Sequence, residues 1–299
     1  MSGIILGVDA GGSKTAVIVA DGERNLARAT GPGARMRSGK GIACATVIGE
    51  VSRRALADAG RLRAATLIAG VAGAGREEER DELRQALRTE DFADRVVVIA
   101  DTEIALAAAF GDRPGIVVTA GTGSVAIGRD HAGRLHRAGG LGWQMGDEGS
   151  GYAIGRAALG AVGRAADGRS PRTELTPLLL RMTRSDNMDM LVRWAAAAGV
   201  PEVASLAPAV FEAAQMGDTI AAGIMDYAAR ELAALVRRLL PHFGMDERAP
   251  VEVAMNGGLL FHDGPLHRLL HAKLAEESRL RQRERPLEAA AGAIHLAKK

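Results

Sequence analysis

The sequence predicts an α/β protein of two domains. Short aliphatic runs at residues 4–8, 67–71, 96–100, 116–120 and 251–255 alternate with stretches of helical spacing, as they do where strands and helices share one domain. Glycine clusters directly follow three of these runs. The length of 299 residues is about twice that of a common single domain.

Residues 1–113 are expected to form the first domain, because Pro114-Gly115 marks a boundary. The hairpin of two strands comes first, with its turn at 9–14. The glycine at position 60 is expected to end the first helix. The elements expected here, in order, are strands 4–8 and 15–20, helix 42–60, strand 67–71, a polar helix 77–87, strand 96–100 and helix 102–110.

The second domain begins by repeating the first. A strand over 116–120, a turn over 121–124 and a returning strand over 125–128 follow the pattern of the opening, with Ala120-Gly121 standing 110 residues after Ala10-Gly11. The later elements are helix 152–166, mostly helical residues over 172–243 with a long helix at 219–240, strand 251–255, and helices 265–280 and 287–297.

Composition excludes several classes of protein. The 38 basic and 36 acidic residues nearly balance, so nucleic acid and anionic membranes are not expected as partners. A single cysteine, Cys44, excludes an internal disulfide framework and a cysteine-based zinc site. The chain has no apolar run long enough to span a membrane and no signal peptide pattern, so a cytoplasmic location is expected.

Three glycine loops, at 9–15, 121–124 and 256–258, are the strongest functional signal. Glycine lets the backbone approach an anion closely and direct several N–H groups at it. One such loop is more often a plain turn, but three that directly follow apolar strands predict phosphate binding. The residues expected to bind the cofactor are Asp9, Gly11, Gly12, Ser13, Lys14, Thr15, Gly121, Thr122, Gly123, Ser124, Asn256, Gly257 and Gly258.

The first loop departs from a P-loop. Gly7 and Gly12 have the correct spacing, but Ser13 intervenes before Lys14, and a strand follows where a P-loop opens a helix. We therefore expect a hairpin tip. Asp9, being anionic, is expected to hold Mg²⁺ through water beside the phosphates.

The order of these motifs resembles the sugar kinase, Hsp70 and actin superfamily. The more specific resemblance is to the BadF/BadG/BcrA/BcrD ATPase family, which includes N-acetylglucosamine kinases. It is carried by DAGGSKT at 9–15, AGTGS at 120–124, GWQMGDEGS at 142–150, NGG at 256–258 and PLEAAAGA at 286–293.

This resemblance implies an actin-like (ribonuclease H-like) fold, in which each domain has a mixed sheet with flanking helices. The terminal helix would return to the first domain, giving domains of 1–113 plus 287–299 and of 114–286. ATP and Mg²⁺ are the implied cofactors, and a sugar is the implied small-molecule partner. We also expect a homodimer.

Asp101 is the candidate general base. It follows an apolar strand and precedes a helix, and ligands of α/β proteins gather at such strand ends. Position alone leaves a helix cap equally open. The resemblance matches Asp101 to the catalytic aspartate of the family, which accepts the proton of the sugar hydroxyl.

The stretch 142–150 carries the expected sugar contacts, which are Trp143, Asp147, Glu148 and the nearby Ser124. The resemblance implies that Asp147 binds sugar hydroxyls, for which a carboxylate is suited, and Trp143 offers a ring face. Helix capping and core packing are the competing explanations. Ala34 apparently replaces a sugar-contacting asparagine of the amino-sugar kinases, in a segment that also has Arg35 and Arg37.

The leading hypothesis is an ATP-dependent kinase that phosphorylates an amino sugar such as N-acetylglucosamine or glucosamine. The alternative is a BadF-type ATPase that acts as an activator without a sugar acceptor. Activators of that type hold an iron–sulfur cluster through cysteines, and Cys44 stands alone. A sugar-sensing transcription factor would need a DNA-binding segment, and the first strand already begins at residue 4.

Overall fold

The computed structural model describes residues 3–22, 24–244, 250–283 and 287–297. The chain divides into two compact units, Met1–Arg113 with Leu287–Lys299 as unit 1, and Pro114–Pro286 as unit 2. Pro286, which opens the last sequence motif, lies outside the described residues. No helix in the described part of the chain is both long and apolar enough to cross a membrane.

Unit 1 contains a mixed sheet of five strands in the order β3-β2-β1-β4-β5. β1 pairs antiparallel with β2 and parallel with β4, which in turn runs parallel to β5. The carboxyl ends of β1, β4 and β5 therefore meet at one edge of the sheet. The strands are β1 (Ile4–Ala10), β2 (Lys14–Asp21), β3 (Arg24–Pro32), β4 (Ala64–Val71) and β5 (Ala93–Ala100).

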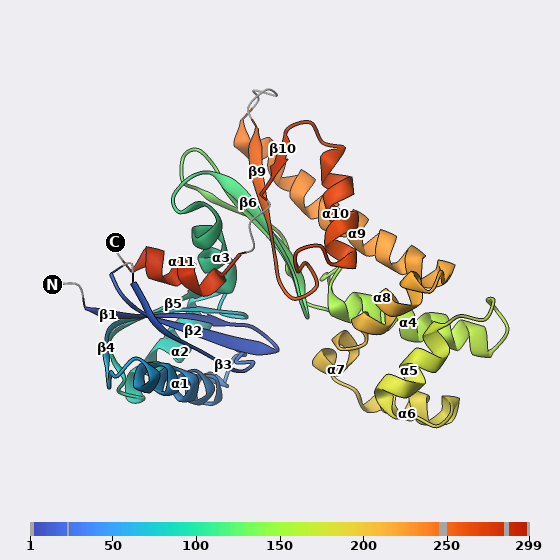
Figure 1. Ribbon diagram of the computed structural model, residues 1–299, viewed down its shortest axis with the longest axis horizontal. Coiled ribbons are helices and arrows are strands. Elements are labelled where there is room, and N and C mark those ends of the chain that lie inside the picture. Colours follow the sequence, from blue (N-terminus) through green and yellow to red (C-terminus); the bar gives the residue numbers. More distant parts are fainter. Residues whose placement is uncertain (1–2, 23, 245–249, 284–286, 298–299) are drawn as a thin grey trace. The chain divides into compact units, whose positions relative to one another are not determined.

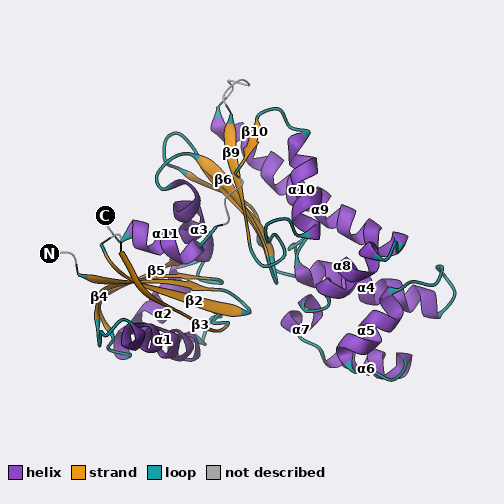
Figure 2. Cartoon of the chain, in the orientation of Figure 1, coloured by secondary structure: helices purple, strands orange, loops and turns teal. Residues whose placement is uncertain are grey.

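Helices cover both faces of this sheet (Figures 1 and 2). Side chains alternate between the faces along each strand, so Leu6 and Val8 pack with α1 and α2, whereas Ile5 and Ile18 pack against α11. The terminal helix α11 also packs on α3. The helices of unit 1 are α1 (Gly41–Asp58), α2 (Glu77–Thr89), α3 (Asp101–Phe110) and α11 (Ala289–Leu296).

Unit 2 repeats this strand order as β10-β9-β6-β7-β8. An antiparallel meander of three strands again precedes two parallel strands, so the repeat expected from the sequence is confirmed in the topology. The strands are β6 (Gly115–Ala120), β7 (Ser124–Arg129), β8 (Leu135–Gly139), β9 (Val251–Asn256) and β10 (Leu280–Gln282).

A large helical part packs on the second sheet and forms the main core of unit 2. In Figure 1, α9 runs beside α10 and past α4 and α8. The helices of unit 2 are α4 (Gly151–Ala166), α5 (Leu175–Thr183), α6 (Met188–Ala197), α7 (Val200–Ala204), α8 (Ala207–Gln215), α9 (Thr219–Leu239), the 3-10 helix η1 (Leu240–Phe243) and α10 (Pro265–Ala275).

Candidate functional site

Two carboxylates of unit 1 lie at the carboxyl ends of β1 and β5, the two strands that flank β4. Asp9 is the penultimate residue of β1, and Asp101 directly follows β5 as the first residue of α3. The register aligns Asp9 with Gly70 of β4 and Gly70 with Ile99 of β5. The carboxyl ends of the parallel strands thus bring together two residues that are 92 positions apart in the sequence.

Asp9 has a strongly perturbed pKa. The pKa of its carboxyl is raised from 3.8 to about 7, chiefly by burial and also by the negative charge of Asp101, whereas the positive charge of Lys14 lowers it. Burial disfavours an ionised carboxylate, and a second carboxylate nearby has the same effect. Perturbed carboxylates of this kind are common at functional sites.

Asp101 is not the N-cap residue of α3. Ala100 has the extended backbone of the N-cap, and the amide of Ala100 donates to Glu103 Oε1 at 3.3 Å. Asp101 lies one position further on, where its Oδ1 accepts from the amide of Thr102 at 2.9 Å. Glu103 and Asp101 each accept one backbone N–H at the start of α3. The start of the helix is therefore not stabilised by Asp101 alone.

The hairpin tip between β1 and β2 presents backbone donors. The amide of Gly11 is used within the turn, where it donates to Lys14 O at 2.9 Å. Within the described residues, the amides of Gly12 and Ser13 have no acceptor. Gly12, Ser13 and Lys14 are exposed. This tip can therefore offer two N–H groups and an ammonium group to an anion.

Thr15 is placed differently from the rest of this loop. It is fully buried, and its hydroxyl donates to Pro32 O at 2.7 Å. The hydroxyl thus holds β2 to the end of β3, and the side chain presents no surface to a ligand within unit 1.

The segment after β3 supports the hairpin tip. Ala34 donates its amide to Gly11 O at 3.0 Å, and a Cβ on Gly33 would lie 2.4 Å from Gly12 O. The methyl group of Ala34 belongs to the apolar core cluster of unit 1 and is 4% exposed. The sequence predicts Ala34 in a segment that contacts the sugar, whereas in the structure its side chain packs in the core of unit 1.

An ion pair missed by the sequence analysis fixes the ends of β4 and β5. Arg80 Nη2 lies 3.0 Å from Glu103 Oε1, and Arg80 Nε donates to Ala74 O at 2.9 Å. Glu82 accepts from the amides of Gly39 and Gly41. The sequence predicts residues 77–87 only as a polar helix, because a charged run carries no signal of the distant groups that it contacts.

Two glycine loops lie side by side in unit 2, because β6 and β9 are parallel neighbours. Gly257 has a φ of +96°, and a Cβ there would lie 2.3 Å from Ala120 O. The same carbonyl accepts from the amide of Leu259 at 3.2 Å. Only glycine permits this close approach, so the loops at 121–124 and 256–258 are held together.

Asp147 packs onto the first of these loops. Its Oδ1 accepts from the amide of Ser124 at 3.3 Å, and its Oδ2 would lie 2.9 Å from a Cβ on Gly123. Ser124 Oγ donates to Glu148 O at 2.6 Å. Asp147 is 6% exposed. In the described part of this loop, the amides of Thr122 and Gly123 have no acceptor, as in the tip of unit 1.

The stretch 142–150 presents its side chains in two directions. Asp147 contacts the loop at 121–124, whereas Trp143 and Glu148 line a groove between α4 and α9. The ring of Trp143 lies 5.2 Å from that of Tyr152. The structure therefore brings together Ser124 and Asp147 but separates Trp143 from them.

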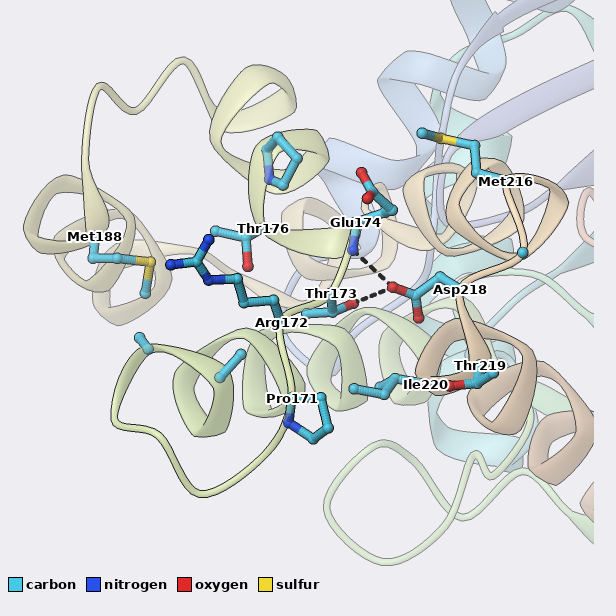
Figure 3. Close-up of a pocket in the computed structure, with 14 residues that line it drawn as sticks. Pro171, Arg172, Thr173, Glu174, Thr176, Met188, Met216, Asp218, Thr219 and Ile220 are labelled. Atoms are coloured by element: carbon cyan, nitrogen blue, oxygen red, sulfur yellow. Dashed lines mark hydrogen bonds between the residues drawn. The ribbon is translucent and has the colours of Figure 1, made fainter.

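A different cavity, of about 680 Å³, lies at the junction of α4, α5 and α9 (Figure 3). Asp218 Oδ2 there accepts from Thr173 Oγ1 at 2.6 Å and from the amide of Glu174 at 2.7 Å, and Asp218 Oδ1 caps α9. This carboxylate serves to join the helices. None of the site residues expected from the sequence lines this cavity.

Comparison with known proteins supports the resemblance seen in the sequence. The model of the BadF/BadG/BcrA/BcrD ATPase family matches residues 6–297. An N-acetylmuramic acid/N-acetylglucosamine kinase from Clostridium acetobutylicum is 32% identical over 85% of this chain and 84% of its own. An N-acetyl-D-glucosamine kinase from Dictyostelium discoideum is 30% identical over 91% and 90%.

The fold is also that of solved relatives. A candidate N-acetylglucosamine kinase from Chromobacterium violaceum superposes with a TM-score of 0.80 at 26% identity, over 98% of both chains. The expected α/β fold of mixed sheets with flanking helices is thereby confirmed.

Proposed function

Because the chain belongs to the BadF/BadG/BcrA/BcrD ATPase family, we propose that it transfers the γ-phosphoryl group of ATP to a hydroxyl of an amino sugar such as N-acetylglucosamine or glucosamine. One observation carries the proposal: the carboxylates of Asp9 and Asp101, at the ends of the two strands that flank β4, interact electrostatically. The names of the relatives, both N-acetylglucosamine kinases, indicate the acceptor class.

Asp101 is proposed as the general base. Phosphoryl transfer requires a group that accepts the proton of the attacking hydroxyl, and a positioned base contributes about 10²–10⁴-fold to the rate. Its place at the start of α3 supports this role, because Glu103 shares the hydrogen bonding of the first turn. Asp147 is proposed to bind sugar hydroxyls and to hold the amide of Ser124 at the same time.

The glycine loops are proposed to bind the phosphates. In each unit, a hairpin tip has two consecutive amides without an acceptor among the described residues, at 12–13 and at 122–123. Such amides can donate hydrogen bonds that replace the water a phosphate loses when it binds. Lys14, exposed at the first tip, adds a positive charge. Gly257 and Gly258 complete the proposed nucleotide contacts.

The residues present also fit Mg²⁺. Its usual protein ligands are one or two carboxylates together with water and phosphate oxygens, so a dedicated cluster is not required. No group of three or more potential ligand side chains is found within the described ranges. Asp9, whose burial disfavours its own charge, would hold the ion through water, and the ion would supply charge neutralisation at the phosphates.

The alternative function, an ATPase activator that works through an iron–sulfur cluster, is less well supported. It would need a reactive thiolate. Cys44 is buried, donates its thiol to Ala34 O at 3.0 Å, and has a pKa raised to about 12 by burial. Such a thiol remains protonated and shielded.

A coupled assay of ADP release tests the proposal. Neutral, amino, N-acetylated amino and acidic sugars are each added to the protein with Mg-ATP. We expect slow ADP release without sugar and a strong increase with one or more amino sugars, accompanied by formation of the sugar phosphate. Equal ADP release with and without every sugar would support the ATPase alternative instead. The homodimer stays a prediction, which light scattering would test.

A further inference from the structure

Arg80 of α2 joins the helix layers on the two faces of the sheet in unit 1. α2 packs with α1 on one face, whereas α3 packs with α11 on the other (Figure 1). Arg80 Nη2 lies 3.0 Å from Glu103 Oε1 of α3, and Arg80 Nε donates to Ala74 O at 2.9 Å. The side chains of Arg80 and Glu103 are each 24% exposed. One guanidinium group, mostly shielded from water, therefore connects α2 to the segment after β4 and to the start of α3.

Glu103 links this guanidinium group to the candidate general base. The Oε1 atom that pairs with Arg80 also accepts from the amide of Ala100 at 3.3 Å. Ala100 ends β5 and directly precedes Asp101, so the first turn of α3 is held on both sides of Asp101. The direction of a helical side chain follows from the helix backbone. The position of this turn therefore sets the direction of the Asp101 carboxylate.

The segment after β4 is also tied to the end of β1. The amide of Ala72 donates to the carbonyl of Ala10 at 2.8 Å, and Ala10 directly follows Asp9. Ala74, whose carbonyl accepts from Arg80, lies two residues beyond Ala72. Polar contacts therefore connect the strand end that carries one carboxylate to the helix that begins with the other.

Apolar packing alone does not set the direction of α3. A Cβ on Gly70 of β4 would lie 2.4 Å from Ile104 Cδ1, so α3 rests closely on β4. Apolar contacts of this kind are non-directional, whereas hydrogen bonds weaken steeply when their angles change. The contacts of Arg80 therefore restrict a rotation of α3 that the packing of Ile104 would allow.

From these contacts we propose that Arg80 is a positioning residue for the general base and acts through Glu103. Its guanidinium group holds the first turn of α3 in place and, with it, the carboxylate of Asp101. The proposal rests on the proposed function, in which Asp101 accepts the proton of the sugar hydroxyl. A displacement of about 1 Å in a reacting group can lower a rate about 10²-fold. The competing explanation is that Arg80 only fastens α2 to α3 and contributes stability.

Replacing Arg80 by methionine separates these two explanations. Methionine removes both hydrogen bonds and keeps an unbranched side chain. We expect Arg80→Met to lower the kcat of sugar-stimulated ADP release about 10- to 100-fold, with KM values for ATP and sugar within about twofold of the wild type. Arg84→Met is the matched control, because Arg84 pairs with Asp81 within the same helix, and it should keep the wild-type kcat. A lower Tm with an unchanged kcat would overturn the proposal.

Variants of Glu103 test the route of the effect, and they do so even if Arg80→Met fails to fold. Glu103→Ala removes the acceptor that Arg80 and Ala100 share, so it should reproduce the loss of kcat. Glu103→Gln keeps an acceptor oxygen and should recover most of it. Arg80→Met added to Asp101→Asn should lower the residual rate little further, because a residue that acts through another has no independent effect. Losses that multiply would overturn the proposal.

A measurement without sugar keeps this proposal separate from the proposed function. The carboxylates of Asp9 and Asp101 repel each other. Urea unfolding at pH 8 of Asp9→Asn, Asp101→Asn and the double variant measures this interaction as a double-mutant cycle. Arg80→Met should weaken the interaction, because a carboxylate that is no longer held moves away from the like charge. Arg84→Met should leave it unchanged.

The outcomes for the two proposals are distinguishable. A weaker interaction in Arg80→Met, without ADP release stimulated by any sugar, would support the placement of Asp101 by Arg80 and contradict the kinase. Sugar-stimulated ADP release in the wild type, with both kcat and the interaction unchanged in Arg80→Met, would support the kinase and overturn the positioning role.

Discussion

Replacing Asp9 by asparagine is expected to stabilise the ligand-free protein at and above neutral pH. The pKa of Asp9 is raised from 3.8 to about 7 by burial and by the charge of Asp101. In the unfolded chain the carboxyl is solvated and its pKa returns to about 3.9. At pH 8 the folded protein must therefore hold an ionised carboxylate in a place that disfavours it.

The pH range follows from these two pKa values. The folded state binds the proton more tightly, so the cost of the charge is absent below about pH 4, grows up to about pH 7 and is constant above. A difference of about three pKa units corresponds to about 4 kcal/mol. Asp9 is partly open to solvent, which reduces this cost. We therefore expect the difference in unfolding free energy between Asp9→Asn and the wild type to increase by about 2–4 kcal/mol, in favour of the variant, from pH 4 to pH 8.

Urea unfolding of both proteins across this pH range provides the measurement. The difference between the two proteins is the informative quantity, because it cancels carboxyls such as Asp130 and Asp218, whose lowered pKa values act in the opposite direction. The stabilised variant should also bind Mg-ADP more weakly than the wild type. A difference that stays constant from pH 4 to pH 8 would show that Asp9 has an ordinary pKa and refute the reasoning.

Three further substitutions have defined outcomes. Asp101→Asn should lower kcat about 10²–10⁴-fold without lowering Tm, because the amide oxygen still accepts the helix N–H and a like charge is removed. Turnover near the wild-type value would contradict the general-base role, and a lower Tm with it would make Asp101 a structural residue. Gly257→Ala should cost about 1–3 kcal/mol of stability, because φ is +96° and its Cβ would lie 2.3 Å from Ala120 O. Gly258→Ala, with open space around its Cβ, is the control for stability, and equal losses would contradict the account. Ala34→Asn should destabilise the protein by about 1–3 kcal/mol, because the side chain at this position is buried. It should not improve the turnover of any sugar. Faster turnover of N-acetylglucosamine would show that the side chain at position 34 reaches the substrate.

The apolar strands could be predicted from the sequence, whereas the polar strands at the sheet edges could not. The expected strands at 4–8, 67–71, 96–100, 116–120 and 251–255 all occur, because strands covered on both faces must be apolar; of these, only the strand at 96–100, β5, lies at an edge. β3, β8 and β10 were missed. They are edge strands with one neighbour each, and their polar and glycine residues give no continuous apolar run.

The sequence by itself determined the local chemistry of the candidate site. Glycine turns after strands, a carboxylate at the end of β1 and another after β5 are all local features, since each depends on backbone freedom or on residue order. The sequence also determined the duplication of the hairpin, through the repeat at an offset of 110 residues.

Only the tertiary structure decided which side chains face one another. Parallel pairing brought Asp9 near Asp101, and burial set the pKa of Asp9. The packing of α4 against α9 turned Trp143 to the groove, while Asp147 turned to the loop at 121–124. These outcomes depend on contacts between segments far apart in the chain, and the free energy of such contacts is not contained in the local pattern of residues.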